Sequence, residues 1–178
     1  MRGNPITTRM IPSIFTLANL LFGFLALIWV IEGAYTLAAA MILLSVLMDS
    51  LDGKVARRLS VSSDFGKELD SLSDLVSFGV APAILTYQAI LYPQSDYVKY
   101  AGLVIAAVFA LCGAVRLARF NMMNITTYFV GVPITFAGGF MALLMFFRTM
   151  LPWYIYLISM VVLAFLMVST FKVAKLGK

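Results

Sequence analysis

The stretch DSLDGKVARRLSVSSDFGKELDSLSD, from Asp49 to Asp74, holds most of the negative charge of the chain. Six of the eight acidic residues lie within it: Asp49, Asp52, Asp64, Glu68, Asp70 and Asp74. Long apolar runs flank the stretch on both sides. Because buried carboxylates are costly unless they are paired or bound to a cation, this concentration of acids indicates a functional site.

The composition of the whole chain predicts an integral membrane protein. The 178 residues are 62% apolar, with a mean hydropathy of +0.99. Nearly uncharged runs of about eighteen or more residues suffice to cross a hydrocarbon core of roughly 30 Å. The length predicts a single transmembrane domain, residues 1–178. The first apolar run is interpreted as a retained span, because no small-residue cleavage signature follows it.

The apolar runs and turn residues predict an all-α fold with six transmembrane helices. These are expected at about 11–31, 34–57, 66–92, 96–120, 130–147 and 151–171. A short N-terminal segment, about 1–10, is expected to lie at the membrane surface. If the N-terminus is cytoplasmic, only Lys99 and Arg148 among the 13 basic residues lie on the opposite side. The positive-inside bias therefore places both termini and the acidic stretch on the cytoplasmic side of the cell membrane.

The chain lacks several residue types on which common chemistries depend. It has no histidine, which excludes histidine-ligated zinc, Ser-His-Asp catalysis and imidazole acid–base chemistry. Its one cysteine, Cys112, cannot form an intrachain disulfide. The net charge of +5 is explained by attraction to an anionic inner leaflet, so no nucleic-acid partner is predicted.

The spacing of four aspartates predicts that their carboxylates converge. Asp49 and Asp52 are three residues apart and Asp70 and Asp74 four apart, so each pair shares one helix face. The connection between the two helices is short, which predicts antiparallel neighbours. Oxygen ligands without nitrogen or sulfur favour hard divalent cations, so we predict two Mg²⁺ or Mn²⁺ ions, as in two-metal sites for displacement at phosphorus.

Small residues lie beside these acids. Gly53 and Ala56 follow Asp49 and Asp52 by one turn, and Gly66 precedes Asp70 by one turn. The absence of bulk would admit a flat or phosphorylated group close to the cations. Arg57 follows within reach of phosphate oxygens.

The combined pattern resembles the signature of the CDP-alcohol phosphotransferase family, also called CDP-alcohol phosphatidyltransferases. The matching residues are Asp49-x-x-Asp52-Gly53-x-x-Ala56-Arg57, eight residues, then Gly66-x-x-x-Asp70-x-x-x-Asp74. The resemblance implies a homodimer with two catalytic divalent ions held by these four aspartates. It also implies a CDP-linked lipid donor, a hydroxyl acceptor that displaces CMP, and Asp74 as the general base.

Three further segments resemble the phosphatidylserine synthase branch of this family. They are SFGVAPA from Ser77, RLARFN from Arg116 and YFVGVPITFAGG from Tyr128. They imply transfer of a phosphatidyl or archaetidyl group from CDP-diacylglycerol or CDP-archaeol to L-serine. Arg116 and Arg119, three apart near a helix end, are expected to bind the carboxylate of serine. The CDP-lipid is expected to contact Asn19, Asp52, Gly53, Ala56, Arg57, Ser63 and Gly66.

Other interpretations of the same residues remain open. Asn19 is equally well explained as a polar contact between helices, and the arginines as membrane anchors. Glycerol 3-phosphate or inositol phosphate is an alternative acceptor within the family. Intramembrane acids also occur in divalent-cation transporters, but the last two predicted spans carry almost no polar residues at depth, which argues against that class.

Overall fold

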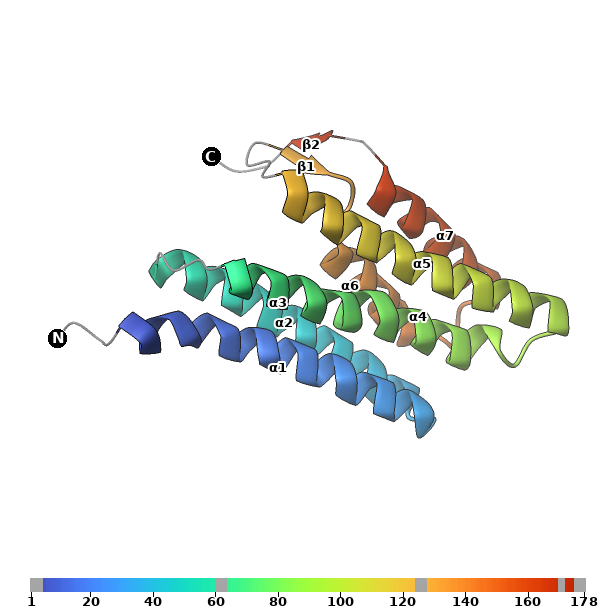
Figure 1. Ribbon diagram of the computed structural model, residues 1–178. Coiled ribbons are helices and arrows are strands. Elements are labelled where there is room, and N and C mark those ends of the chain that lie inside the picture. The colour runs from blue at the N-terminus through green and yellow to red at the C-terminus, as the bar shows by residue number, and fades with distance from the viewer. Residues whose placement is uncertain (1–4, 60–63, 124–127, 170–171, 175–178) are drawn as a thin grey trace.

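The computed structural model describes residues 5–59, 64–123, 128–169 and 172–174, which form one bundle of helices (Figure 1). The two chain ends lie at the same end of the bundle. The principal helices are α1 (Pro5–Ile31), α2 (Tyr35–Leu59), α3 (Asp64–Asp74), α5 (Asp96–Met123), α6 (Ile134–Met145) and α7 (Trp153–Val168).

The third predicted span is one continuous helix with two π-helical segments. After α3 come the π-helix η1 (Leu75–Val80), α4 (Ala81–Thr86) and a second π-helix, η2 (Tyr87–Leu91). Residues 64–91 form the centre of the bundle, because 61% of an apolar 18-residue window within them is buried, against 28% for the corresponding window of each of the other three long spans. π-helical segments often occur at functional sites. Here η1 starts at the residue after Asp74.

The helices confirm the prediction of a helical, multi-pass membrane protein. By length and composition, four are sufficient to cross a membrane: Ser13–Ile31, Tyr35–Val55, Asp64–Leu91 and Asp96–Met122. The helices α6 and α7 are apolar but shorter, with 12 and 16 residues. Helix α1 runs without a break from Pro5 through Pro12. The count of six spans and the surface location of residues 1–10 stay predictions.

The structure departs from the sequence prediction before α6 and after α7. Residues 130–133 were expected to start the fifth span. Instead, Val130 ends a short strand, and residues 131–133 form a turn that leads into α6. The strand β1 (Tyr128–Val130) pairs antiparallel with β2 (Lys172–Ala174). Gly131 has a φ of 74°, a backbone conformation that favours glycine. Pro133, whose ring restricts its own φ, immediately precedes the first residue of α6.

Close approach of helices at glycines positions the central span. Gly138 of α6 faces η1, where a β-carbon would come within 2.6 Å of the Phe78 Cα atom. Gly113 of α5 faces Ile134, whose Cδ1 atom would lie 2.6 Å from a β-carbon at that glycine. These contacts bring α5, α6 and η1 together just beyond the acidic residues of α3.

We predict that Gly138→Ala lowers the thermal midpoint of the protein in detergent. The added methyl group would collide with the Phe78 backbone, which cannot yield as a side chain can, and overpacking of this kind costs about 1–3 kcal/mol. Gly139→Ala is the matched control, since its methyl group would meet only the Val46 Cγ2 atom at 3.3 Å. Equal midpoints for the two variants would contradict this account of the packing.

Candidate active site

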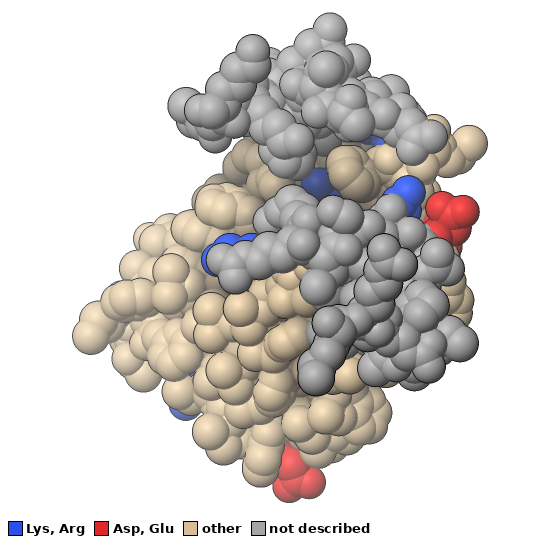
Figure 2. Space-filling model, turned by 90° about the vertical axis from the view of Figure 1, so that its left-hand side faces the viewer, with Lys and Arg blue, Asp and Glu red and all other residues tan. Residues whose placement is uncertain are grey.

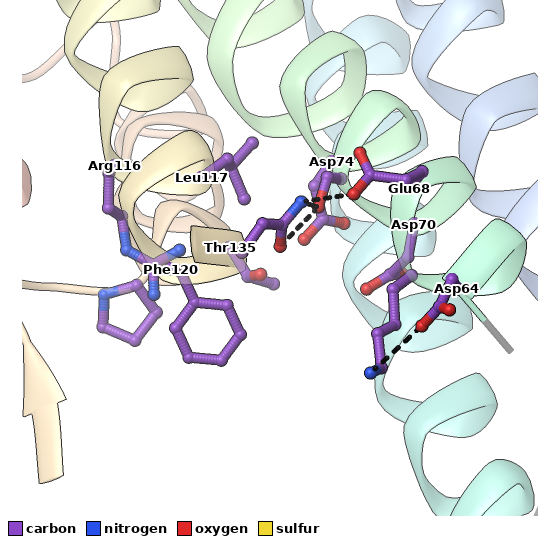
Figure 3. Close-up of a pocket in the computed structure, with 12 residues that line it drawn as sticks. Asp64, Glu68, Asp70, Asp74, Arg116, Leu117, Phe120 and Thr135 are labelled. Atoms are coloured by element: carbon purple, nitrogen blue, oxygen red, sulfur yellow. Dashed lines mark hydrogen bonds and ion pairs between the residues drawn. The ribbon is translucent and has the colours of Figure 1, made fainter. Parts of the chain in front are cut away.

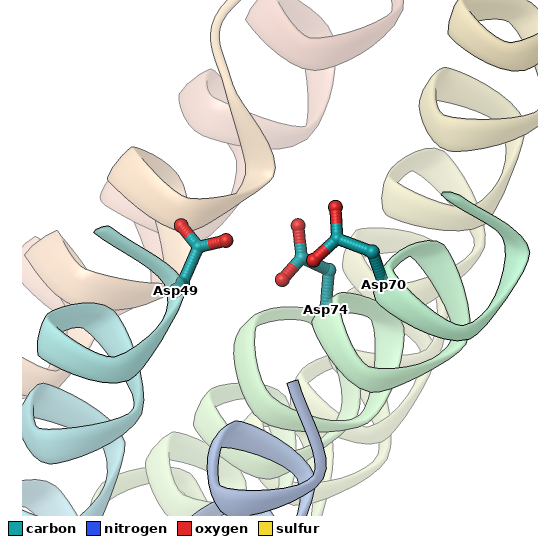
Figure 4. A group of neighbouring side chains, drawn as sticks. All are labelled: Asp49, Asp70 and Asp74. Carbon is teal, nitrogen blue, oxygen red and sulfur yellow. The ribbon is translucent and has the colours of Figure 1, made fainter. Parts of the chain in front are cut away.

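Three of the predicted aspartates converge in the structure. Carboxylate oxygens of Asp49, Asp70 and Asp74 all lie within 4.8 Å of one another. Figure 4 shows Asp49 on α2 facing Asp70 and Asp74 on α3. Helices α2 and α3 run antiparallel, but they contact each other little, and α1 packs against both of them (Figure 1). The acids therefore face one another across a space between two helices that α1 holds in place.

Asp52 lies beside this group and is held by α1. It is buried, with 7% of its surface exposed, and its Oδ2 atom accepts a hydrogen bond of 3.0 Å from the Thr16 hydroxyl. Its carboxylate is also close enough to those of Asp49 and Asp70 to interact with them electrostatically. Asp52 thus belongs to the same site as the other three aspartates, with Thr16 fixing one of its oxygens.

Of the three converging aspartates, Asp74 is the one that is buried. It is 7% exposed, and its Oδ1 atom accepts a hydrogen bond of 3.1 Å from the Asn19 Nδ2 atom. Asn19 is fully buried, and its own side-chain oxygen has no hydrogen-bond partner among the described residues. The sequence had left open whether Asn19 joins helices or binds the donor. The structure shows that Asn19 joins helices through its contact with Asp74, and its amide oxygen is left available for a contact with the donor.

Two hydroxyl residues at this site were not predicted from the sequence. Thr16 donates a hydrogen bond to Asp52, and the Thr135 side chain of α6 lies next to that of Asp49 and interacts with it electrostatically. Both lie in apolar segments, where polar side chains are rare and usually face a neighbouring helix or a functional site. That rarity was the available signal.

A cavity of about 610 Å³ opens beside Asp70 and Asp74 (Figure 3). Arg116 of α5 lines it, and the buried Nε atom of this arginine has no hydrogen-bond partner among the described residues. The other lining residues are Asp64, Lys67, Glu68, Ser71, Leu117, Phe120, Asn121, Pro133 and Thr135. A cavity with acids on one wall and an arginine on the other can receive a small polar molecule.

The two predicted serine-binding arginines have different surroundings. Arg116 lines the cavity, whereas Arg119 donates a 2.7 Å hydrogen bond from Nη1 to the Val168 carbonyl, the last residue of α7. Arg119 is not among the lining residues, and its role in serine binding stays a prediction.

The predicted donor contacts are described only in part. Gly53 and Gly66 are half-buried residues of α2 and α3. Ser63 and the side chains of Ala56 and Arg57 lie outside the described residues. Figure 2 looks onto this end of the molecule, where basic and acidic residues occur close together and residues without charge cover most of the remaining described area.

The donor set fits hard divalent cations. Asp49, Asp70 and Asp74 supply only oxygen atoms, and the Oδ1 atom of Asp70 is buried without a hydrogen-bond partner among the described residues. The one ion pair found in the described part of the chain joins Lys67 to Asp64 at 3.7 Å, so no described Lys or Arg forms an ion pair with these three aspartates. Clustered carboxylates repel one another, and a divalent ion with oxygen ligands removes that repulsion.

We expect Asp70→Asn to weaken Mn²⁺ binding by about tenfold to a hundredfold, because a charge-assisted ligand becomes a neutral one. Calorimetric titration of the purified protein with Mn²⁺ measures this change without any substrate. Asp96→Asn is the control, since Asp96 is an exposed acid in the first turn of α5. Equal dissociation constants for the two variants would exclude Asp70 as a cation ligand.

Comparison with known proteins agrees with this geometry. A family model described as CDP-alcohol phosphatidyltransferase matches residues 9–171. A Methanocaldococcus jannaschii protein named CDP-diacylglycerol–serine O-phosphatidyltransferase is 40% identical over 160 residues, covering 90% of this chain and 71% of the relative. A Bacillus subtilis protein of the same name is 37% identical, covering 76% of this chain and 75% of the relative. The archaetidylserine synthase of Methanothermobacter thermautotrophicus is 41% identical, but the match covers only 54% of that relative and 72% of this chain.

Proposed function

Since the chain belongs to the CDP-alcohol phosphatidyltransferase family, we propose that it is a membrane enzyme that uses L-serine as acceptor. It transfers a phosphatidyl or archaetidyl group from a CDP-linked lipid to the serine hydroxyl and releases CMP. The observation that carries this proposal is the placement of the cavity. The Arg116 side chain lines the same space as Asp70 and Asp74, so an anionic group of the acceptor can bind beside the reacting phosphate.

The four aspartates hold the catalytic cations in this proposal. Asp49, Asp70 and Asp74 supply the converging oxygens, and Asp52 lies next to Asp70. Two Mg²⁺ or Mn²⁺ ions, when bound, neutralise the diphosphate of the donor and the charge that develops on the leaving CMP. Thr16 keeps Asp52 oriented, and Thr135 does the same for Asp49.

The acceptor is positioned and activated by two residues of the cavity. Arg116 binds the carboxylate of serine, because its guanidinium is a planar donor suited to that group. Asp74 takes the proton from the serine hydroxyl as general base, while Asn19 holds the Oδ1 atom of that carboxylate. The serine oxygen then attacks the lipid-bearing phosphate and the bond to CMP breaks.

The remaining assignments follow from the family and from the predicted orientation. The CDP portion of the donor binds against Asn19, Asp52, Gly53, Ala56 and Gly66, with Arg57 and Ser63 at its phosphates. The enzyme acts as a homodimer, with its active site on the cytoplasmic side of the cell membrane. The half-buried Gly53 of α2 and the amide oxygen of Asn19, which has no hydrogen-bond partner among the described residues, support the donor placement.

A direct assay tests the proposed function. Purified protein is incubated with CDP-diacylglycerol or CDP-archaeol and Mn²⁺ or Mg²⁺, and CMP release is measured with each of three acceptors. We expect release with L-serine and little with glycerol 3-phosphate or inositol phosphate. Release only with a phosphorylated acceptor would overturn the serine assignment. Cation uptake into proteoliposomes without CMP release would favour a transporter.

We predict that Arg116→Ala raises the KM for serine by about tenfold to a hundredfold, because a charge-assisted contact with the carboxylate is lost. The KM for the CDP-lipid should change far less. Arg148→Ala is the matched control, since Arg148 lies over the ring of Tyr35 at the other end of the bundle. Equal changes in both KM values would show that Arg116 is a general anchor.

Asp74→Asn should separate proton transfer from donor binding. The variant keeps an oxygen at the site but loses the base, so kcat should fall by about a hundredfold to ten-thousandfold. Binding of the CDP-lipid with Mn²⁺ present should weaken only modestly. Asp49→Asn, in contrast, should weaken donor binding and shift the metal dependence to higher concentration. If both variants lose donor affinity equally, Asp74 is chiefly a ligand and another group is the base.

A further inference from the structure

Asn19 is the point at which three segments of the bundle are joined by polar contacts. Its backbone carbonyl accepts a hydrogen bond of 3.0 Å from the Ser77 hydroxyl of η1. It also lies 3.1 Å from the Ser45 hydroxyl of α2, which shares its one proton between this carbonyl and the Met41 carbonyl at 3.2 Å. Its side-chain Nδ2 atom donates to Asp74 at 3.1 Å. Asn19, Ser45 and Ser77 are all fully buried.

The two hydroxyls do not satisfy an otherwise unpaired helix end. Asn19 lies in the interior of α1, where a carbonyl already faces the N–H group four residues further along the helix. That residue is Gly23, and a β-carbon there would overlap the Ser77 side chain and lie 2.9 Å from the Ser77 Cα atom. The absence of a side chain at Gly23 is therefore what lets Ser77 reach the Asn19 carbonyl.

Through Asn19, these contacts are connected to Asp74, the acid that we propose as the general base. Asp74 and Ser77 are three residues apart at the junction of α3 and η1, and both contact Asn19. A movement of Asn19 would thus move the donor that holds the Asp74 Oδ1 atom. Proton abstraction depends on placement of the base within a few tenths of an ångström of its productive position.

We propose that Ser45, Ser77 and Gly23 form a positioning unit for Asp74 that acts through Asn19. The two hydroxyls fix the backbone of Asn19, Gly23 provides the room for one of them, and the Asn19 amide then holds one oxygen of Asp74. The second oxygen of Asp74 remains available to the acceptor. This inference rests on the proposed function for its catalytic consequence.

The test compares Ser77→Ala with Ser73→Ala. Ser73 is also fully buried and lies one turn earlier, but among the described residues its hydroxyl donates only to the Leu69 carbonyl of its own helix, at 2.8 Å. At saturating Mn²⁺ we expect Ser77→Ala to lower kcat by about threefold to tenfold, the usual effect of one lost hydrogen bond. Both KM values should stay within about twofold. Ser73→Ala should leave all three constants near those of the wild type.

Gly23→Ala gives an independent disturbance of the same unit. Its methyl group would displace Ser77 without removing the hydroxyl, so we expect the same loss of kcat with unchanged KM values. A double-mutant cycle with Asn19→Ala identifies the route. If Ser77 acts through Asn19, Ser77→Ala causes no further loss of kcat in the Asn19→Ala protein. An equal fractional loss in both backgrounds would overturn the inference.

Mn²⁺ titration supplies a measurement that requires no turnover. Because Asp74 belongs to the acidic cluster, Ser77→Ala should raise the Mn²⁺ dissociation constant by about threefold, and Ser73→Ala should leave it unchanged. Matching dissociation constants for the two serine variants would overturn the inference. A wild-type protein that releases no CMP would overturn the proposed function alone, since the titration still tests the positioning unit.

Discussion

Mutual repulsion among clustered carboxylates, which are partly or fully buried, is the constraint on which this structure depends. Asp49, Asp70 and Asp74 approach within 4.8 Å, so the fold must hold α2 and α3 close against that repulsion. The bracing contacts come from neutral donors on other helices. Thr16 and Asn19 of α1 donate hydrogen bonds to Asp52 and Asp74, and Thr135 of α6 lies next to Asp49. Neutral donors orient the acids but do not neutralise their charge, which suits a site for cations.

The packing of the rest of the bundle positions Thr16, Asn19 and Thr135 next to the aspartates. The central span is the most buried of the four long ones, and glycines bring its neighbours close to it. Gly138 brings α6 against Phe78, which fixes the helix that carries Thr135. The strand pair β1–β2 and the turn at Gly131 set where α6 begins. Packing well away from the acids therefore determines which donors reach them.

The sequence could predict what local spacing encodes. Intervals of three and four residues place acids on one helix face, so the convergence of Asp49, Asp70 and Asp74 followed from the motif, as did the apolar helices. Thr16, Thr135 and Ser77 make contacts between segments that are far apart in the chain. The spacing of residues along one helix cannot predict such contacts. Arg116 and Arg119 show the same limit. Their spacing suggested a shared role, yet the end of α7 provides Arg119 with a backbone carbonyl as its partner.

The charge of the cavity bears on which acceptor it can accept. The described lining has two basic residues, Arg116 and Lys67, and Lys67 lies 3.7 Å from Asp64 in an ion pair. Asp70 and Asp74 are assigned to the proposed cations, so Glu68 is the acid of the described lining that has neither a cation nor an ion pair. Apart from the proposed cations, a doubly charged phosphate would find Arg116 as its one described basic partner without an ion pair, and Glu68 would repel it. A zwitterion carries one carboxylate for Arg116 and one ammonium group that Glu68 attracts. This balance favours an amino acid such as serine over a phosphorylated alcohol.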